Sequence, residues 1–324
     1  MSSTKTEYLL KNKSLVESAV RQQRYLLSAY SFVNIFLWKD FFEFRLEVIE
    51  HALCVFAKNE MGCFMYLPPL GGNLSRAVID RCFVEMEAVN RGNGVTRIEN
   101  FENKRSDLFP EKEFETVLKS RDYCYFREDI VALKGNPYKS QRNEYNRFVA
   151  DGAHRFLPFD PSMTEECASL YDRWACAKKK NSTDDVFVHM IEENRSVHRL
   201  AMQFYQELEL TGYVATVNGA IRGYTFGFAL NKDILCVLME IADPGMDGLP
   251  VFLFREFCRS RELQGFPFIN AMDDFNMPNI RATKMSFHPI ILVPSYNVAC
   301  REETFGPASD MGSSAAPFGE KLRN

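Results

Sequence analysis

The chain has 324 residues, of which 46% are hydrophobic and 13% aromatic. This composition excludes a mainly disordered protein and supplies core-forming side chains for two ordinary domains or one large one. Its 39 lysines and arginines against 43 aspartates and glutamates give a net charge of −4, which excludes a surface that coats nucleic acid everywhere but leaves room for a local basic patch.

The cysteines and histidines argue against a metal site. Nine cysteines are scattered through apolar segments without CxxC spacing, and the five histidines form no HExxH motif. We therefore expect reduced, buried thiols and no metal. Residues 1–13 are polar, and no apolar stretch approaches the roughly 20 residues that span a bilayer. These features predict a cytoplasmic protein.

The first half of the chain predicts helices and strands in alternation. Apolar positions at intervals of three and four predict a helix over residues 14–38, and two apolar runs predict strands within 42–57 and 63–67. Ser75 is expected to cap a helix that ends near residue 90. A strand at 95–101, a short helix near 111–119, extended chain at 123–133 and a helix over 138–150 follow.

The second half predicts more strand. After a strand at 156–159, helices are expected at 164–179 and 184–208. An Asn-Gly pair at 218–219 between alternating apolar residues predicts a hairpin of strands 212–217 and 221–229. Strands at 234–242, 266–271 and 290–298 and helices at 251–263 and 277–284 complete the order, and the Ser/Gly/Ala/Pro-rich segment 301–324 is expected to be a flexible tail.

The helix at 138–150 carries a polar stripe. Lys139, Arg142, Asn143 and Asn146 are spaced i, i+3, i+4 and i+7 and so share one face. Between residues 134 and 147 four cations, including Lys134, oppose one anion, a local charge of +3. Arginine forks and asparagine amides would suit a phosphate-bearing ligand, although an ordinary solvated helix face would show the same pattern.

A second polar group follows the strand at 266–271. Asn270 and Asp273 lie at its end, and Arg281 and Lys284 lie one helical turn apart just beyond. Strand ends that lead into loops commonly carry ligand contacts in α/β folds. Asp273 could accept a proton from an acceptor, and the two cations could face phosphate or an oxyanion. Capping and salt bridging of the local helix is the competing interpretation.

Glu240 is an ionisable residue inside the apolar strand at 234–242. Burial would raise the pKa of its carboxyl group and fit it for general-base catalysis. An outward-facing position or a buried ion pair would explain the same residue without catalysis.

The helix, helix, hairpin, strand, loop, helix, strand order of 162–298 is similar to the GNAT acyltransferase fold, and the first half repeats it more coarsely. Specific residues make the chain resemble the phosphatidylglycerol lysyltransferase C-terminal-domain-like family over about residues 25–298. These are Lys134, Gly135, Tyr138, Lys139, Arg142, Asn143, Asn146 and Phe148, with Asn270, Asp273, Arg281, Lys284, Ser286 and Pro289 downstream and Ser31, Asn34, Phe36 and Trp38 near the start.

The resemblance implies an α/β (α+β) fold of two tandem GNAT-like domains, residues 1–155 and 156–300, each with a mixed, mostly antiparallel sheet flanked by helices. It also implies an acyltransferase that moves an aminoacyl group from aminoacyl-tRNA to an amine or hydroxyl, with Glu240 and Asp273 catalytic. Donor binding would fall to Lys134, Tyr138, Lys139, Arg142, Asn143, Asn146, Asn270, Arg281 and Lys284.

Two alternative functions stay open. One is a non-catalytic module that binds a nucleotide or RNA through the basic stripe. The other is an N-acetyltransferase that uses acetyl-CoA. GNAT enzymes hold the CoA pyrophosphate on the amides of a glycine-rich loop, and the corresponding residues 244–250 contain two glycines but no cation, with Asp247 positioned to repel a pyrophosphate.

Overall fold

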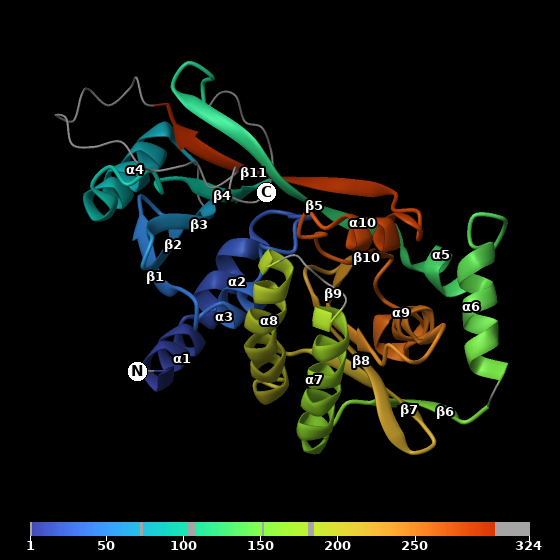
Figure 1. The fold of residues 1–324 in the computed structure, drawn as a ribbon. Coiled ribbons are helices and arrows are strands. Elements are labelled where there is room, and N and C mark those ends of the chain that lie inside the picture. Colours follow the sequence, from blue (N-terminus) through green and yellow to red (C-terminus); the bar gives the residue numbers. More distant parts are fainter. Residues whose placement is uncertain (1, 72–73, 103–107, 151, 181–184, 302–324) are drawn as a thin grey trace. The chain divides into compact units, whose positions relative to one another are not determined.

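The computed structural model describes residues 2–71, 74–102, 108–150, 152–180 and 185–301. The predicted tail at 301–324 lies outside these residues except for Arg301. The described chain divides into two compact units, unit 1 from the segments 1–121 and 293–324 and unit 2 from residues 122–292. Both are mixed α/β structures (Figure 1).

Unit 1 contains the sheet order β1-β2-β3-β4-β11. Strands β1, β2 and β3 pair antiparallel, β3 and β4 pair parallel, and β11 pairs antiparallel with β4. The strands are β1 (Glu43–Ile49), β2 (Ala52–Asn59), β3 (Gly62–Leu70), β4 (Ile98–Phe101) and β11 (Ile291–Cys300), and the helices are α1 (Ser2–Lys11), α2 (Lys13–Arg21), α3 (Phe32–Leu37) and α4 (Arg76–Asn90). The core cluster between α4 and the strands includes Phe56, Phe83 and Val298.

Unit 2 contains the sheet order β10-β9-β8-β7-β6, with β10 parallel to β9 and the other pairs antiparallel. The last residues of β5 (Phe114–Phe126) pair antiparallel with β10. The strands are β6 (His154–Pro158), β7 (Thr211–Val217), β8 (Ala220–Ala229), β9 (Ile234–Ala242) and β10 (Phe268–Asn270). The helices are α5 (Arg127–Ala132), α6 (Lys139–Ala150), α7 (Thr164–Lys180), α8 (Asp185–Gln203), α9 (Leu249–Arg259) and α10 (Pro278–Met285), with 3₁₀ turns at Pro161–Met163 and Arg261–Leu263.

The two faces of the unit 2 sheet carry different helices. Tyr224 and Phe226 of β8 face α7 and α8, where the Tyr224 hydroxyl contacts His198 at 2.9 Å. Gly223 and Gly227, on the opposite face of β8, lie against Leu253 and Phe257 of α9. A core cluster on this α9 face includes Tyr125, Val237 and Phe254. Each fully buried apolar side chain of this size contributes about 1.5–3 kcal/mol.

The predicted fold class is confirmed: both units are α/β with mixed, mostly antiparallel sheets, and each contains a strand, helix, strand segment whose two strands are parallel. The compact units do not divide at residue 155. Residues 123–138 join the core of unit 2, because β5 pairs with β10 and the side chains of Tyr125, Ile130 and Tyr138 pack in its core cluster.

Two predicted helices are wrong. Residues 114–119 belong to strand β5, in which pairing overrides the helix preference of a Glu/Lys-containing segment. The helix expected over 14–38 is broken between Arg21 and Phe32, where the Glu102 carboxylate accepts hydrogen bonds from the amides of Leu26 and Leu27 at 3.0 and 3.2 Å. The Ser75 cap and the hairpin at Asn218–Gly219 are confirmed.

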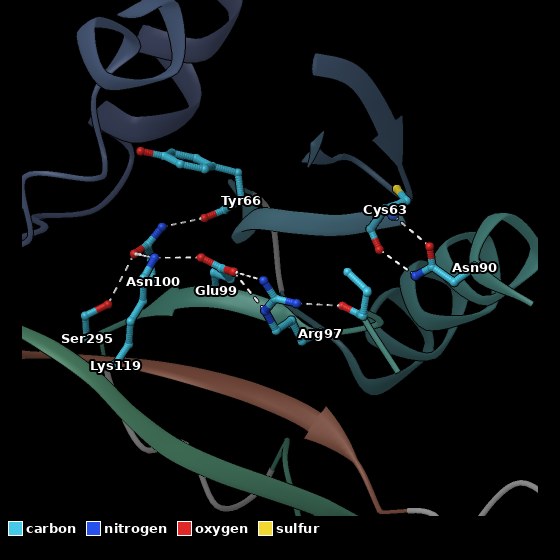
Figure 2. A network of polar contacts seen from close by, with 9 residues as sticks. Cys63, Tyr66, Asn90, Arg97, Glu99, Asn100, Lys119 and Ser295 are labelled. Carbon is cyan, nitrogen blue, oxygen red and sulfur yellow. Dashed lines mark hydrogen bonds and ion pairs between the residues drawn. The ribbon is translucent and has the colours of Figure 1, made fainter. Parts of the chain in front are cut away.

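Polar residues are also buried in unit 1, where they form a network (Figure 2). The Glu99 carboxylate accepts hydrogen bonds from Arg97 Nε at 2.8 Å and from Lys119 Nζ at 2.6 Å. Asn100 donates to the Tyr66 carbonyl at 2.9 Å and accepts from Lys119 at 3.0 Å. Burial raises the pKa of the Glu99 carboxyl group, but the two cations outweigh burial and hold that pKa below its usual range.

All nine cysteines are free thiols, as expected, and seven are buried. Cys54 and Cys82 have their sulfur atoms 3.5 Å apart in the core of unit 1.

Candidate active site

Strands β9 and β10 pair with each other only along the first part of β9. Their parallel register ends at the pair Cys236–Asn270. The chain beyond Asn270 follows β5 instead, because the Ala271 amide donates to the Tyr123 carbonyl at 2.9 Å and the Tyr123 amide donates to the Met272 carbonyl at 3.2 Å. Among the described residues, no strand therefore pairs with the β10 side of β9 from Val237 onward.

Glu240 lies in the part of β9 that does not pair with β10. A bulge places Leu238 outside the β8–β9 register, so that Val237 pairs with Gly227 and Met239 with Phe226. The bulge inverts the alternation and turns Glu240 to the α9 face, opposite Thr225. Its Oε2 atom is buried and has no hydrogen-bond partner among the described residues. Burial raises the pKa of the Glu240 carboxyl group to about 8.

The loop that follows β10 is organised by Asp274. Its buried carboxylate accepts hydrogen bonds from the Tyr123 hydroxyl at 2.6 Å, from Arg281 Nε at 2.7 Å and from the Asn276 amide at 2.9 Å. Burial alone would raise the pKa of Asp274, but these donors lower it. Asp274 therefore joins β5, the loop and helix α10, while half of the Arg281 side chain, 51%, stays exposed.

Lys284 stabilises the same loop through hydrogen bonds to its backbone carbonyls. Its ammonium group donates to the carbonyls of Ala271 at 2.6 Å and Met272 at 3.3 Å, and also to the carbonyl of Asp273. Three carbonyls use the three protons of the ammonium group, and burial lowers the pKa of Lys284. The expected phosphate contact of Lys284 would require it to release this loop. Asp273 itself is half-buried.

Asn270 also has a structural contact. Its amide donates to Asp122 Oδ2 at 2.9 Å, and its Oδ1 accepts from the Met272 amide at 2.6 Å. These bonds hold a strained turn, since Met272, Phe275 and Asn276 all have positive φ values of 60°, 50° and 59°. Such conformations cost roughly 1–3 kcal/mol each and persist where the surroundings fix them.

The predicted site residues on α6 and just before it divide into two groups. Tyr138 is buried and donates to the Phe287 carbonyl at 3.1 Å, and Arg142 donates to the carbonyls of Leu133 and Gly135, where it closes the end of α5. The other members are exposed and could meet a ligand; they are Lys134, Lys139, Asn143 and Asn146.

Gln141, which the sequence prediction did not include, connects α6 to the end of α10. Its amide donates to the Ser286 carbonyl at 2.7 Å, next to the Phe287 carbonyl that Tyr138 contacts. All eleven predicted site residues lie in unit 2. The contacts of Tyr138 and Gln141 thus connect the α6 stripe to the Asn270–Lys284 group, whereas Glu240 lies on β9, beneath α9.

The loop between β9 and α9 is closed against α6. Gly248 has a φ of +81°, and a Cβ atom there would lie 2.3 Å from the Glu144 carbonyl oxygen. The amides of Gly245, Met246 and Leu249 already donate within the loop, and Pro250 has no amide hydrogen. Asp247 is exposed. This loop is a poor site for a pyrophosphate.

Besides Gln141, sequence reasoning did not assign Thr225, Tyr123 or Asp274 to the site. Thr225 stands opposite Glu240 in the β8–β9 pair, which the Asn-Gly turn between β7 and β8 does not set and in which the bulge at Leu238 shifts the count. Tyr123 and Asp274 are 151 residues apart, and no local pattern shows their contact.

Neither a metal centre nor a membrane span is found in the part of the chain that the structure describes. There, no three His, Cys, Asp or Glu side chains are grouped to hold a metal ion. None of the described helices combines the length and the apolar character needed to cross a bilayer.

The fold matches solved structures over nearly its whole length. A conserved protein of unknown function from Bacteroides thetaiotaomicron is 22% identical, with a TM-score of 0.79 over 90% of this chain and 97% of that one. The C-terminal domain of a putative lysylphosphatidylglycerol synthetase from Agrobacterium fabrum is 13% identical, with a TM-score of 0.63 over 92% and 93%. L-PGS from Bacillus licheniformis is 15% identical, with a TM-score of 0.59 over 88% and 90%.

No curated protein matches the chain in sequence. The family described as "Phosphatidylglycerol lysyltransferase, C-terminal" matches residues 22–299. That range includes every predicted site residue and most of both units. The chain has an acyltransferase-like fold and belongs to the phosphatidylglycerol lysyltransferase C-terminal family.

Proposed function

We propose that this protein is an acyltransferase that moves an aminoacyl group from an aminoacyl-tRNA to an amine or hydroxyl acceptor. The proposal rests mainly on Glu240. Its carboxyl group has a buried oxygen without a hydrogen-bond partner among the described residues, and it lies in the part of β9 that does not pair with β10. Its pKa of about 8 suits a group that accepts a proton near neutral pH.

The proposed reaction balances without a covalent enzyme intermediate. The acceptor nitrogen or oxygen bonds to the aminoacyl carbonyl carbon as its proton passes to Glu240. The ester bond to the tRNA ribose then breaks, and the ribose oxygen takes up this proton from Glu240, which returns the carboxyl group to its starting state. Arg281, exposed over half of its side chain, is the cation that we assign to the oxyanion or to a donor phosphate.

The closed loop between β9 and α9 favours aminoacyl-tRNA over acetyl-CoA as the donor. The amides of Gly245, Met246 and Leu249 donate within the loop, Gly248 lies against α6, and Asp247 adds a negative charge. The exposed cations Lys134 and Lys139, with Asn143 and Asn146, supply instead a surface on which a nucleic-acid backbone could lie.

A transfer assay with a mixed pool of radiolabelled aminoacyl-tRNAs and, separately, labelled acetyl-CoA tests this proposal. Small primary amines, alcohols and phosphatidylglycerol vesicles serve as acceptors. We expect label to leave tRNA for an acceptor in the wild type and not in Glu240→Gln. Transfer from acetyl-CoA alone would identify acetyl-CoA, and not aminoacyl-tRNA, as the donor. Salt-dependent tRNA binding without transfer to any acceptor would show a binding module and contradict the proposed enzyme.

A further inference from the structure

Three polar residues form a row across strands β7, β8 and β9 on the face that α9 covers. Thr225 of β8 pairs with Tyr213 of β7 on one side and with Glu240 of β9 on the other. Directly opposed residues on one face of an antiparallel pair have Cβ atoms roughly 4.5–5.5 Å apart. The side chains of Thr225 and Glu240 are therefore immediate neighbours.

Two members of this row are left without hydrogen bonds. Thr225 is 0% exposed, and neither its Oγ1 nor Glu240 Oε2 has a partner among the described residues. Tyr213, by contrast, donates its hydroxyl to Glu262. Burying a hydroxyl without a partner is unfavourable, and each of these two adjacent oxygens is an available partner for the other.

The surroundings of the pair contain few competing charges. Leu253 and Phe257 of α9 lie against Gly223 and Gly227, on either side of Thr225 along β8. Cys258 of α9 is a titratable group within electrostatic reach of Glu240. Glu262 is held by Tyr213 at the far end of the row, and burial alone accounts for the raised pKa of Glu240.

We propose that Thr225 is a positioning residue: its hydroxyl donates a hydrogen bond to Oε2 of Glu240, directly or across one water molecule, when the carboxyl group is ionised. The hydrogen bond from Thr225 is stronger when Glu240 is ionised than when it is protonated, because charged acceptors form stronger hydrogen bonds than neutral ones. The contact fixes the carboxyl group so that its other oxygen can receive the proton of the acceptor. This catalytic consequence rests on the proposed function, whereas the contact itself does not.

The test follows the ionisation of Glu240 through the stability of the whole protein. The free energy of unfolding is measured in urea between pH 5 and pH 10 for the wild type, Thr225→Val, Thr225→Ser and Glu240→Gln. The part of the pH dependence that disappears in Glu240→Gln belongs to Glu240. Thr216→Val on β7 is the matched control, since it removes a threonine hydroxyl outside the row.

We expect Thr225→Val to move the Glu240 midpoint upward by about one pH unit, a tenfold change in the ionisation equilibrium. Thr225→Ser keeps the hydroxyl and should keep the wild-type midpoint. Thr216→Val should leave it in place as well. Identical midpoints in the wild type and Thr225→Val, or a serine variant that behaves like valine, would overturn the proposal.

The activity assay adds a second readout that a merely structural threonine would not change. In Thr225→Val the basic shift should appear in the pH profile of kcat, with KM nearly unchanged, and Thr225→Ser should restore the profile. If no donor reacts, the proposed function fails while the unfolding data still decide the role of Thr225. Should the valine variant fail to fold, Thr225→Ala removes the hydroxyl without added bulk.

Discussion

Each unit has a carboxyl group with a buried oxygen on a strand of its sheet, and the surroundings shift the pKa values of the two groups in opposite directions. Glu99 in unit 1 is held by Arg97 and Lys119, and its pKa is lowered (Figure 2). Glu240 in unit 2 has an oxygen with no partner, and its pKa is raised to about 8. A paired buried carboxylate is part of the framework, whereas an unpaired one retains its capacity to exchange a proton. Of these two carboxyl groups, the one in unit 2 is therefore the candidate for proton transfer.

Glu240→Gln should give the largest effect on activity and would break the comparison if it did not. The amide keeps the size of the side chain but cannot accept the acceptor's proton, so we expect transfer to fall by about 10²–10⁴-fold. Initial rates with aminoacyl-tRNA measure the loss. Glu128→Gln, which removes an exposed carboxylate of α5, should remain near wild type.

Lys119→Met should reveal the framework role of Glu99. It removes one of the two cations and leaves a buried carboxylate under-compensated, which we expect to lower the free energy of unfolding by about 3 kcal/mol. Urea denaturation at pH 7 is the measurement. Lys58→Met, at an exposed position of β2, is the control; equal losses in the two variants would remove the distinction drawn for Glu99.

The two carboxyl groups should give stability opposite dependences on pH. The pKa of Glu240 is raised from 4.5 to about 8, so its contribution is complete below pH 4.5 and is lost as pH rises toward 8, at no more than about 1.4 kcal/mol per pH unit. Glu99 has a lowered pKa, so its contribution is present at neutral pH and is lost in acid. Glu240→Gln should flatten the pH dependence only between pH 4.5 and about 8, and a change below pH 4.5 instead would reverse the assignments.

Most of the fold could be predicted from the sequence, because its signals are local. The Ser75 cap and the Asn218–Gly219 turn are short-range devices, and both are where the pattern placed them. The breaks in the first helix and the strand at 114–126 depend on Glu102 and on strand pairing. Such partners are distant in sequence, and local propensity cannot show them.

The site was predicted less fully for the same reason. Glu240 stands out as a charge in an apolar strand, but its direction depends on the bulge at Leu238. Lys284 and Arg142 have the residue types of ligand contacts, yet the structure engages both with backbone carbonyls. Residue type and spacing therefore find a polar group but do not say whether it faces a ligand or the chain itself.

The smallest expected effect concerns the exposed part of α6. Lys139→Gln should lower tRNA affinity only modestly and reduce the slope of log affinity against log salt by about one, as the loss of one phosphate contact does. Filter binding across a salt series measures the slope. Lys232→Gln, exposed beyond the end of β8, should leave it unchanged, and an equal change in both variants would mean that α6 has no special place on the surface.

The bulge in β9 determines which face of the sheet each later side chain of the strand occupies. One extra residue, Leu238, decides that Glu240 is delivered to the α9 face and Met239 to the face of α7 and α8. Without the bulge, Leu238 would pair with Phe226 and Glu240 with Tyr224, so the same sequence would place the carboxylate on the face of α7 and α8. One local irregularity of the backbone therefore decides whether the Glu240 carboxyl group faces α9, although the sequence of the strand is the same in both cases.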